Sequence, residues 1–232
     1  MAETMRPLYW LGSARQELND VPDSIREIYA YGLCRMQFGG KFRRARPVSG
    51  YIRTGVLEVV EDNRGDVHRA LYTLRCASAV YVLLFYEKPL MPHRPIPRPE
   101  RELIQSLVNV AASAEGTCDM AGIDRLARVT ITLGRGNAYA DLGFRKPDEM
   151  LIKATLAHEI EEILERRDMR LTQAAALGGL AQAELSQLLR GKFRGTSHAK
   201  LTRCVSQIER DIDLAAAPAG PDIGADPPTV TT

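Results

Sequence analysis

The stretch QAELSQLLRGKFR, residues 182–194, decides the fold of the C-terminal part of this 232-residue chain. Its apolar residues Leu185 and Leu188 recur at helical spacing, and three of its last five residues are basic. A second short helical pattern, residues 171–180, precedes it and contains Gly178-Gly179, which permits a tight turn. The two segments predict two short helices joined by a glycine turn, with Leu185 and Leu188 facing inward.

Further helices are predicted on both sides of this pair. Pro147, followed by two acidic residues, begins a long helix, and residues 198–210 form a later one. The long helix carries one apolar stripe, composed of Ile152, Leu156, Ile160 and Ile163. Residues 212–214 predict a short strand, and residues 216–232, which contain four prolines, predict a disordered tail.

The N-terminal part has a mixed pattern of strands and helices. Strands are predicted at residues 8–11, 56–60, 68–75 and 79–86. Helices are predicted at residues 14–20, with Ser13 as the N-cap, then from 22 to 38, and at 100–112. Residues 41–47 predict a loop, and residues 129–133 an additional strand. The short spacing of the middle strands favours an antiparallel meander, so the fold class is α+β followed by an all-α part.

Composition limits the classes of function. Residues 1–113 contain 16 Lys and Arg against 12 Asp and Glu, whereas residues 114–232 contain 15 against 17. These opposite net charges favour docking of the two halves, and the basic half suits a phosphate-bearing partner. The four cysteines form no CxxC pair, which favours isolated thiols over a metal site. No segment is typical of a signal peptide or a membrane span, so a cytoplasmic protein is expected.

Residues 171–194, together with the lead-in NAYADLG at 137–143, resemble the helix-turn-helix of the Cro/repressor (XRE) superfamily, and the lead-in resembles HigA-type antitoxins. The resemblance covers about residues 137–214 and implies binding to operator DNA. It implies base contacts by Gln182, with Gln187 near the same face, because a glutamine amide can pair with adenine. The implied phosphate contacts are made by Gln173, Arg190, Lys192 and Arg194.

Two features depart from that family. The stretch from Leu171 to Gln182 is about two residues shorter than is usual, and Ala181 stands where the family usually has a capping serine. Such a domain can still neutralise a toxin while reading DNA poorly. The alternative is a plain helical hairpin whose glutamines and arginines are only solvated.

Several N-terminal segments, in order, resemble the HigB-type branch of the RelE-like toxins, over about residues 8–112. They are WLGS at 10–13, GVLEVVED at 55–62, GDVHRALYTLR at 65–75, VYVL at 80–83 and PRPERELI at 97–104. Members of this branch resemble ribosome-dependent mRNA endonucleases. The resemblance therefore implies a mRNA and ribosome partner, and a reaction that requires no metal or other cofactor.

In such a reaction the RNA 2′-hydroxyl attacks the adjacent phosphorus, so cations must hold the charge that gathers on the phosphate. Arg69 matches the family's catalytic arginine, and Lys88 matches a basic residue after the fourth strand. The predicted auxiliary groups are Arg46, Arg75 and Tyr86. His68 and His93 are candidate proton carriers, because histidine titrates near neutrality. The predicted ribosomal-RNA contacts are Lys41, Arg43 and Arg44. Each of these has a simpler interpretation as a solvated surface residue.

The segment LFYEKPLMP at 84–92 departs most from the toxin family. The family usually carries a His-Ala-Phe-Gln-Lys-Lys-Ser-like sequence there, whereas this chain has lost the histidine, gained Glu87 and replaced a lysine by Pro89. The nuclease site has thus lost cations. This observation favours a rival hypothesis, in which the toxin-like half has decayed into an interaction platform for a DNA-binding regulator.

The sequence predicts a toxin–antitoxin fusion. Its parts are a toxin domain at 1–113, a linker at 114–136, an antitoxin domain at 137–215 and a tail at 216–232. Met120, within the linker, resembles the start of a second reading frame that has become internal. The antitoxin domain is expected to contact the toxin domain in the same chain and mask its RNA-binding face, and to repress its own operator. Helix-turn-helix domains of this class commonly dimerise, so a homodimer is also expected.

Overall fold

The computed structural model describes residues 5–40, 45–48, 56–63, 66–73, 79–89, 102, 104–106, 108–109 and 130–216. For residues 62–63, 66–67, 69–73, 86–89 and 211–216 it describes the backbone alone. The predicted contacts Lys41, Arg43, Arg44, Arg75 and His93 lie outside the described residues.

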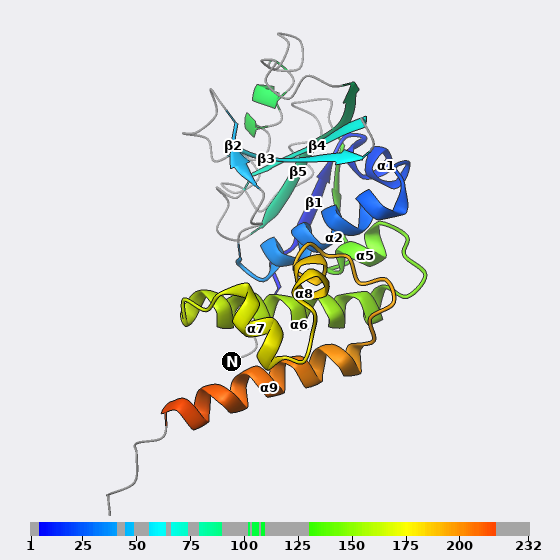
Figure 1. The fold of residues 1–232 in the computed structure, drawn as a ribbon. Helices are drawn as coiled ribbons and strands as arrows, with labels where there is room; N and C mark the ends of the chain where they lie inside the picture. The colour runs from blue at the N-terminus through cyan, green and yellow to red at the C-terminus, as the bar shows by residue number, and fades with distance from the viewer. Residues whose placement is uncertain are drawn as a thin grey trace, which may run out of the picture.

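The described strands form one sheet in the order β2-β3-β4-β5-β1-β6 (Figure 1). Their bounds are β1 Leu8–Leu11, β2 Arg46–Pro47, β3 Val56–Asn63, β4 Asp66–Thr73, β5 Val80–Pro89 and β6 Ile131–Leu133. The predicted antiparallel meander is confirmed in β3, β4 and β5. β1 pairs parallel with β5, and β6 pairs antiparallel with the outer edge of β1.

Three local predictions are corrected in this half. Arg46 and Pro47, predicted in a loop, form the edge strand β2 and pair with β3. The additional strand predicted at residues 129–133 is confirmed as β6, so the assignment of residues 131–133 to the linker is corrected: they belong to the sheet. Ser13 makes no side-chain cap, because its hydroxyl donates to Oε1 of Glu17 at 2.7 Å instead.

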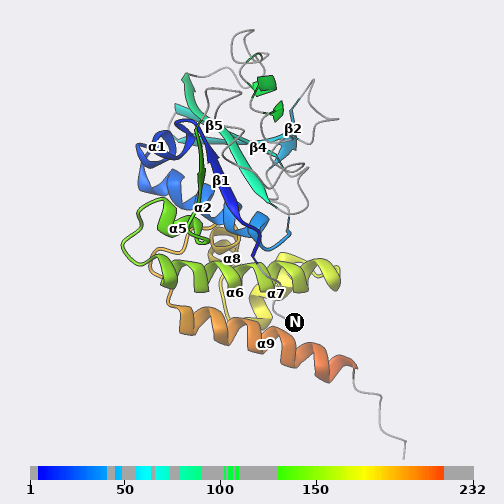
Figure 2. The ribbon, with the colours of Figure 1, turned by 180° about the vertical axis from the view of Figure 1, so that it is seen from behind.

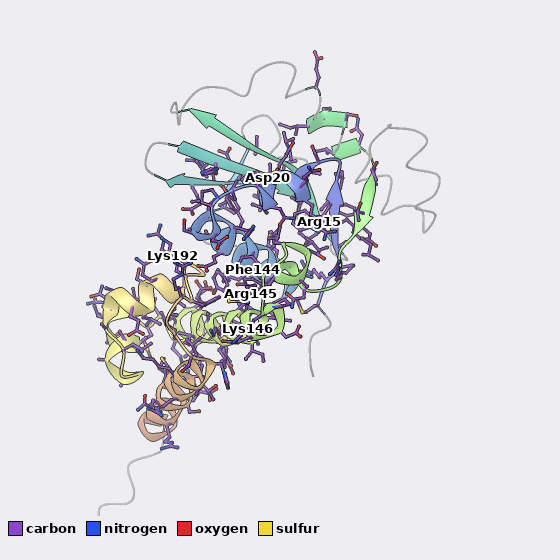
Figure 3. The ribbon with its side chains drawn as sticks, turned by 90° about the vertical axis from the view of Figure 1, so that its right-hand side faces the viewer. Arg15, Asp20, Phe144, Arg145, Lys146 and Lys192 are labelled. Atoms are coloured by element: carbon purple, nitrogen blue, oxygen red, sulfur yellow. The ribbon has the colours of Figure 1, made fainter. Side chains whose placement is uncertain are left out.

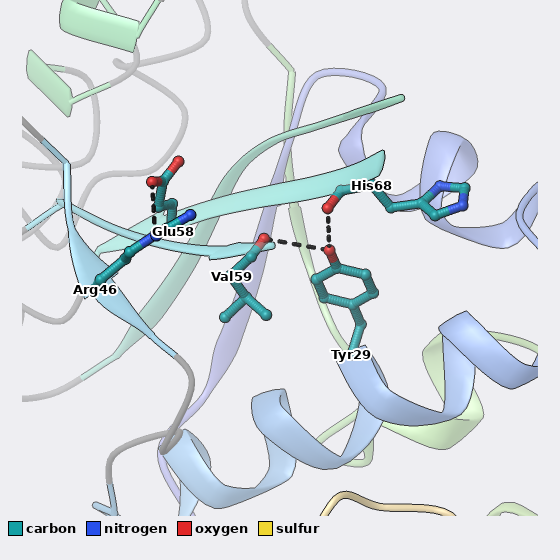
Figure 4. A network of polar contacts seen from close by, with 5 residues as sticks. All are labelled: Tyr29, Arg46, Glu58, Val59 and His68. Atoms are coloured by element: carbon teal, nitrogen blue, oxygen red, sulfur yellow. Dashed lines mark hydrogen bonds and ion pairs between the residues drawn. The ribbon is translucent and has the colours of Figure 1, made fainter. Parts of the chain in front are cut away.

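The helix α2, Asp23–Gln37, lies in the middle of the molecule. α1, Ala14–Asn19, and α2 cover one face of the sheet (Figure 1). Every residue of α2 from Ile28 to Gln37 is buried, which is expected only for a helix that is covered on all sides. Tyr29 anchors α2 to the sheet, because its hydroxyl donates to the backbone oxygen of His68 at 2.8 Å and lies 3.2 Å from that of Val59 (Figure 4).

The second half of the chain is helical, as predicted. Its helices are α5 Ala138–Asp141, α6 Pro147–Arg166, α7 Leu171–Leu177, α8 Gln182–Leu188 and α9 His198–Ala216. Asn137 caps α5 by accepting a hydrogen bond from the backbone N–H of Tyr139. α6 packs against α9 on one side and α2 on the other, and Figure 2 shows α6 and α9 lying side by side.

Two predictions in the helical half are wrong. Residues 212–214 continue α9 and form no strand. Ile152 is 50% exposed, although Ile160 and Ile163 are buried as predicted. The buried face of α6 instead includes Ala154 and Ala157, whose small side chains let α6 approach its neighbours closely.

One continuous core joins the two halves. It contains Trp10 of β1, Tyr31 of α2, Tyr139 of α5, Ile160 of α6 and Phe193 after α8. The expected contact between the halves is therefore present in the chain. Of the predicted helix at 100–112, the described residues are helical, and Ile104 and Val108 among them are buried. No helix among the described residues is long and apolar enough to span a membrane.

Candidate nucleic-acid interfaces

The strand register brings most of the predicted catalytic positions to one face of the sheet. Position 69 of β4 pairs directly with positions 60 and 86, and position 88 pairs with position 67. Directly paired residues share a face, and successive residues alternate between faces. Positions 69, 86 and 88 thus alternate with Val59 and Phe85, which are buried on the side of α2. They belong to the opposite face.

Arg46 lies on this same outer face. Its Nε donates to Oε1 of Glu58 at 3.1 Å, across the pairing of β2 with β3 (Figure 4). Glu58 in turn is opposite Leu71, two residues along β4 from position 69. Arg46 is 51% exposed, so it can reach a ligand on this face while it offsets the charge of Glu58.

His68 lies on the other face of the sheet. It is 1% exposed and stacks on Phe85, with ring centroids 6.3 Å apart. A proton carrier must come within hydrogen-bonding distance of the substrate, and an RNA on the outer face is separated from His68 by the sheet. The candidate role of His68 is therefore dropped. Among the described residues no group of three or more His, Cys, Asp or Glu is arranged to hold a metal ion.

In the helical half, α7 and α8 present the predicted reading surface. Gln182 and Gln187 are exposed, whereas Leu185 and Leu188 are buried at 0% and 1% exposure, as predicted. Gln173 is exposed, and its Oε1 accepts a hydrogen bond from the backbone N–H of Arg170, which caps α7. Both glutamines of α8 are thus open to a ligand in the full chain.

The basic end of α8 lies against the N-terminal half. Nη2 of Arg190 is 3.9 Å from Oε2 of Glu61 on β3. Burial raises the pKa of Glu27 on α2, and the nearby positive charges of Arg194 and Lys192 oppose that rise. Arg190 therefore lies beside a carboxylate of the N-terminal half, and Lys192 and Arg194 follow it on the same turn.

The turn after α8 is fixed against α2. Gly191 has φ +83°, and a Cβ there would lie 2.4 Å from Cβ of Tyr31. The ring of Phe193 meets the ring of Tyr31 edge-on, with centroids 5.5 Å apart. Only glycine can adopt this conformation at such a short distance, so the contact between the halves depends on Gly191.

Sequence reasoning missed the charged groups that join the halves. Arg35 on α2 forms an ion pair with Glu161 on α6, with Nε 2.7 Å from Oε2, and both side chains are almost fully buried. The hydroxyl of Tyr31 also donates to Glu161. Asp141 on α5 accepts from the indole N–H of Trp10 at 3.0 Å. Arg35 and Glu161 each lie within a predicted helix, where charged side chains are common, so the sequence carried no signal that would distinguish them from surface charges.

Cations from both halves lie along one side of the molecule. Figure 3 shows Arg15 of α1, Arg145 and Lys146 before α6, and Lys192 after α8 on this side. Nε of Arg15 donates to the backbone oxygen of Asp141, and Lys146 forms an ion pair with Glu149. The carboxylate of Glu149 offsets the charge of Lys146, whereas Arg15 keeps its full positive charge.

Comparison with known families agrees with the division of the chain. Residues 16–106 match the family described as phage-derived, Gp49-like protein, which is toxin-like, and residues 138–217 match a helix-turn-helix domain family. No curated protein and no solved structure matches the chain. The chain thus combines a toxin-like α+β domain with a helix-turn-helix domain of the DNA-binding class, an arrangement that fits a toxin–antitoxin fusion in general.

Proposed function

We propose that the N-terminal half is a RelE-like, HigB-type endoribonuclease that cuts mRNA on the ribosome. The HigA-type helix-turn-helix half neutralises it in cis and binds operator DNA. The observation that carries this proposal is the register of β4 and β5, in which position 69 is opposite position 86 on the face away from α2. Arg46 on the same face adds a described cation.

In the proposed reaction, the 2′-oxygen forms a bond to phosphorus, its proton passes to solvent water, and the bond from phosphorus to the 5′-oxygen breaks, which leaves a 2′,3′-cyclic phosphate. Arg69 stabilises the charge on the phosphate, and Lys88 stabilises or protonates the leaving 5′-oxygen. Tyr86 is placed by register beside Arg69, where it can stack on a base or donate a proton. Arg46 supplies an auxiliary positive charge. No step requires a metal.

Neutralisation is proposed to act through bulk rather than by covering the catalytic face. The contacts of the helical half described above involve α1, α2, β1 and the α2-facing residue Glu61. These lie on the opposite side of the sheet from position 69. The helical half places α5 to α9 on the α2 side of the sheet, and this added bulk would exclude the chain from a confined ribosomal site. Direct masking of the RNA face, expected from the sequence, is not part of this proposal.

The nuclease proposal is tested with residues 1–136, which retain β6 at the edge of the sheet. We expect this fragment to cleave mRNA in a translating extract, and Arg69→Ala to reduce the cleavage rate about 100-fold, because one preorganised cation is lost. Arg15→Ala on α1 is the matched control. A fragment that is folded by circular dichroism but leaves translated mRNA intact would exclude the nuclease.

The DNA-binding proposal is tested on the full chain, with DNA from upstream of its own coding sequence in a gel-shift titration. Gln182→Ala with Gln187→Ala should weaken specific binding about 10- to 100-fold, because each lost base contact costs discrimination. Binding to unrelated DNA should be unchanged. Gln16→Ala, an exposed glutamine on α1, serves as the control. Equal loss on both DNAs would contradict base reading.

The second candidate function is a DNA-binding regulator with a catalytically decayed toxin-like half. The loss of cations in residues 84–92 favours it. It predicts an inert 1–136 fragment together with specific DNA binding by the full chain, so the two tests above separate the candidates. The homodimer belongs to both proposals, since paired recognition helices suit a two-fold operator.

A further inference from the structure

Three cations that are proposed to contact DNA phosphate, Arg190, Lys192 and Arg194, follow α8. Two carboxylates of the other half, Glu61 and Glu27, influence them electrostatically. Glu61, on β3, is 2% exposed and lies within ion-pair distance of Arg190, whose side chain is 41% exposed. Glu27, on α2, is half-buried and lies one helical turn before Tyr31, the residue that Gly191 lies against. The positive charges of Arg194 and Lys192 oppose the rise that burial causes in the pKa of Glu27. Both carboxylates come from the toxin-like half, which a separate helix-turn-helix protein would not contain.

The backbone that carries these cations is held in place. Gly191 lies against Tyr31, and Phe193, at 1% exposure, fills the space beside the same ring. The turn is thus unable to carry the three cations away from α2 while the halves stay docked. Only their side chains can turn toward a phosphate, and in doing so they must leave Glu61 or Glu27.

When a protein cation binds a DNA phosphate, counterions are released from the DNA. The affinity and its salt dependence therefore both increase with the number of cations that are available to bind phosphate. A carboxylate next to a cation competes with the phosphate and also repels it. We propose that Glu27 and Glu61 form part of the DNA-binding surface and reduce the affinity of the full chain for the DNA backbone. This inference rests on the DNA-binding function proposed above, and it assigns the toxin-like half a direct part in setting that affinity.

The test uses the full chain and a fluorescein-labelled 30-base-pair duplex of unrelated sequence, whose binding is read by anisotropy over a series of salt concentrations. Glu27→Gln with Glu61→Gln should tighten binding about 10-fold at low salt. It should also steepen the slope of log K against log salt by about 1 to 2, as expected for one or two additional phosphate contacts. Glu27→Gln alone should give part of both changes.

The matched control is Glu17→Gln with Asp20→Asn on α1, which changes the net charge by the same amount away from α8. An equal gain in the control, or an unchanged slope in the Glu27 and Glu61 variants, would overturn the inference. Because Glu61 is buried, a thermal melt checks that its variant is folded, and Glu27→Gln alone decides the outcome if it is not.

Failure of the proposed function gives a different result. If the unchanged chain binds duplex and the combined Arg190→Ala, Lys192→Ala, Arg194→Ala variant binds it more weakly, DNA binding stands whatever the carboxylate variants do. If no variant binds duplex at any salt concentration, the proposed function fails and this inference fails with it.

Discussion

Glu161→Gln is expected to lower the free energy of unfolding of the full chain by about 3–5 kcal/mol, because it leaves the buried guanidinium of Arg35 without its counter-charge. Arg35 and Glu161 are 3% and 1% exposed, so water cannot replace the lost carboxylate. For a chain of this length the loss corresponds to a fall in melting temperature of about 10 °C. Urea denaturation followed by circular dichroism measures it directly.

The control removes both charges together. Arg35→Met with Glu161→Leu should recover most of the lost stability, because replacing a whole buried pair by apolar groups is often neutral. The two residues come from different halves, so the double variant also reports on docking. If it is as unstable as Glu161→Gln alone, lost packing at α6, and not an isolated charge, is the cause.

Gly191→Ala is expected to release the end of α8 from α2. The new Cβ would lie 2.4 Å from Cβ and 2.8 Å from Cγ of Tyr31, so one of the two segments must move. The backbone strain of alanine at positive φ adds about 1 kcal/mol. Hydrogen exchange should show loss of protection at Tyr31 and Phe193, while β3, β4 and β5 keep theirs.

Gly195 offers a closely matched comparison. Its φ of +80° is nearly that of Gly191, but a Cβ there meets no atom within 4 Å. Gly195→Ala therefore reports the backbone strain alone, and the difference between the two variants reports the contact with Tyr31. Equal destabilisation would show that α2 tolerates a side chain at position 191, against the fixed docking described above.

The local part of the fold could be predicted from the sequence because it depends on short-range periodicity. Alternation predicted β3, β4 and β5, and the 3.6-residue repeat predicted α2 and α6. The pairing of β1 with β5 and of β6 with β1 joins segments about 70 and 120 residues apart, and no local pattern encodes such pairings.

The docking of the two halves was harder to predict from the sequence. The opposite net charges of the halves predicted their contact. In the sequence, however, Arg35 and Glu161 resemble ordinary surface charges, and only the packing of α6 against α2 brings them together. The burial of α2 on all sides has the same origin, since its second apolar face is explained only by a partner from the far end of the chain. The prediction that Ile152 is buried is wrong because a single apolar stripe assumes one neighbouring element, whereas α6 packs against both α2 and α9.

The candidate sites were predicted to different extents. Resemblance selected Arg69 and Lys88, and the register then related position 69 to Tyr86 and placed Arg46 on the same face; their roles stay predictions. The proximity of Arg190 to Glu61 had no signal in the sequence, because it depends on how the turn at Gly191 meets α2.

The position of β6 has a consequence for the internal Met120. A polypeptide that began there would carry residues 131–133 away from the toxin-like half, whose strand β1 would then expose an unpaired edge. Reassembly of two separately translated products would therefore include strand donation, with the antitoxin segment completing the toxin sheet. The boundary between the two reading frames, at Met120, would thus precede β6, so it would not coincide with the boundary between the sheet and the helical half.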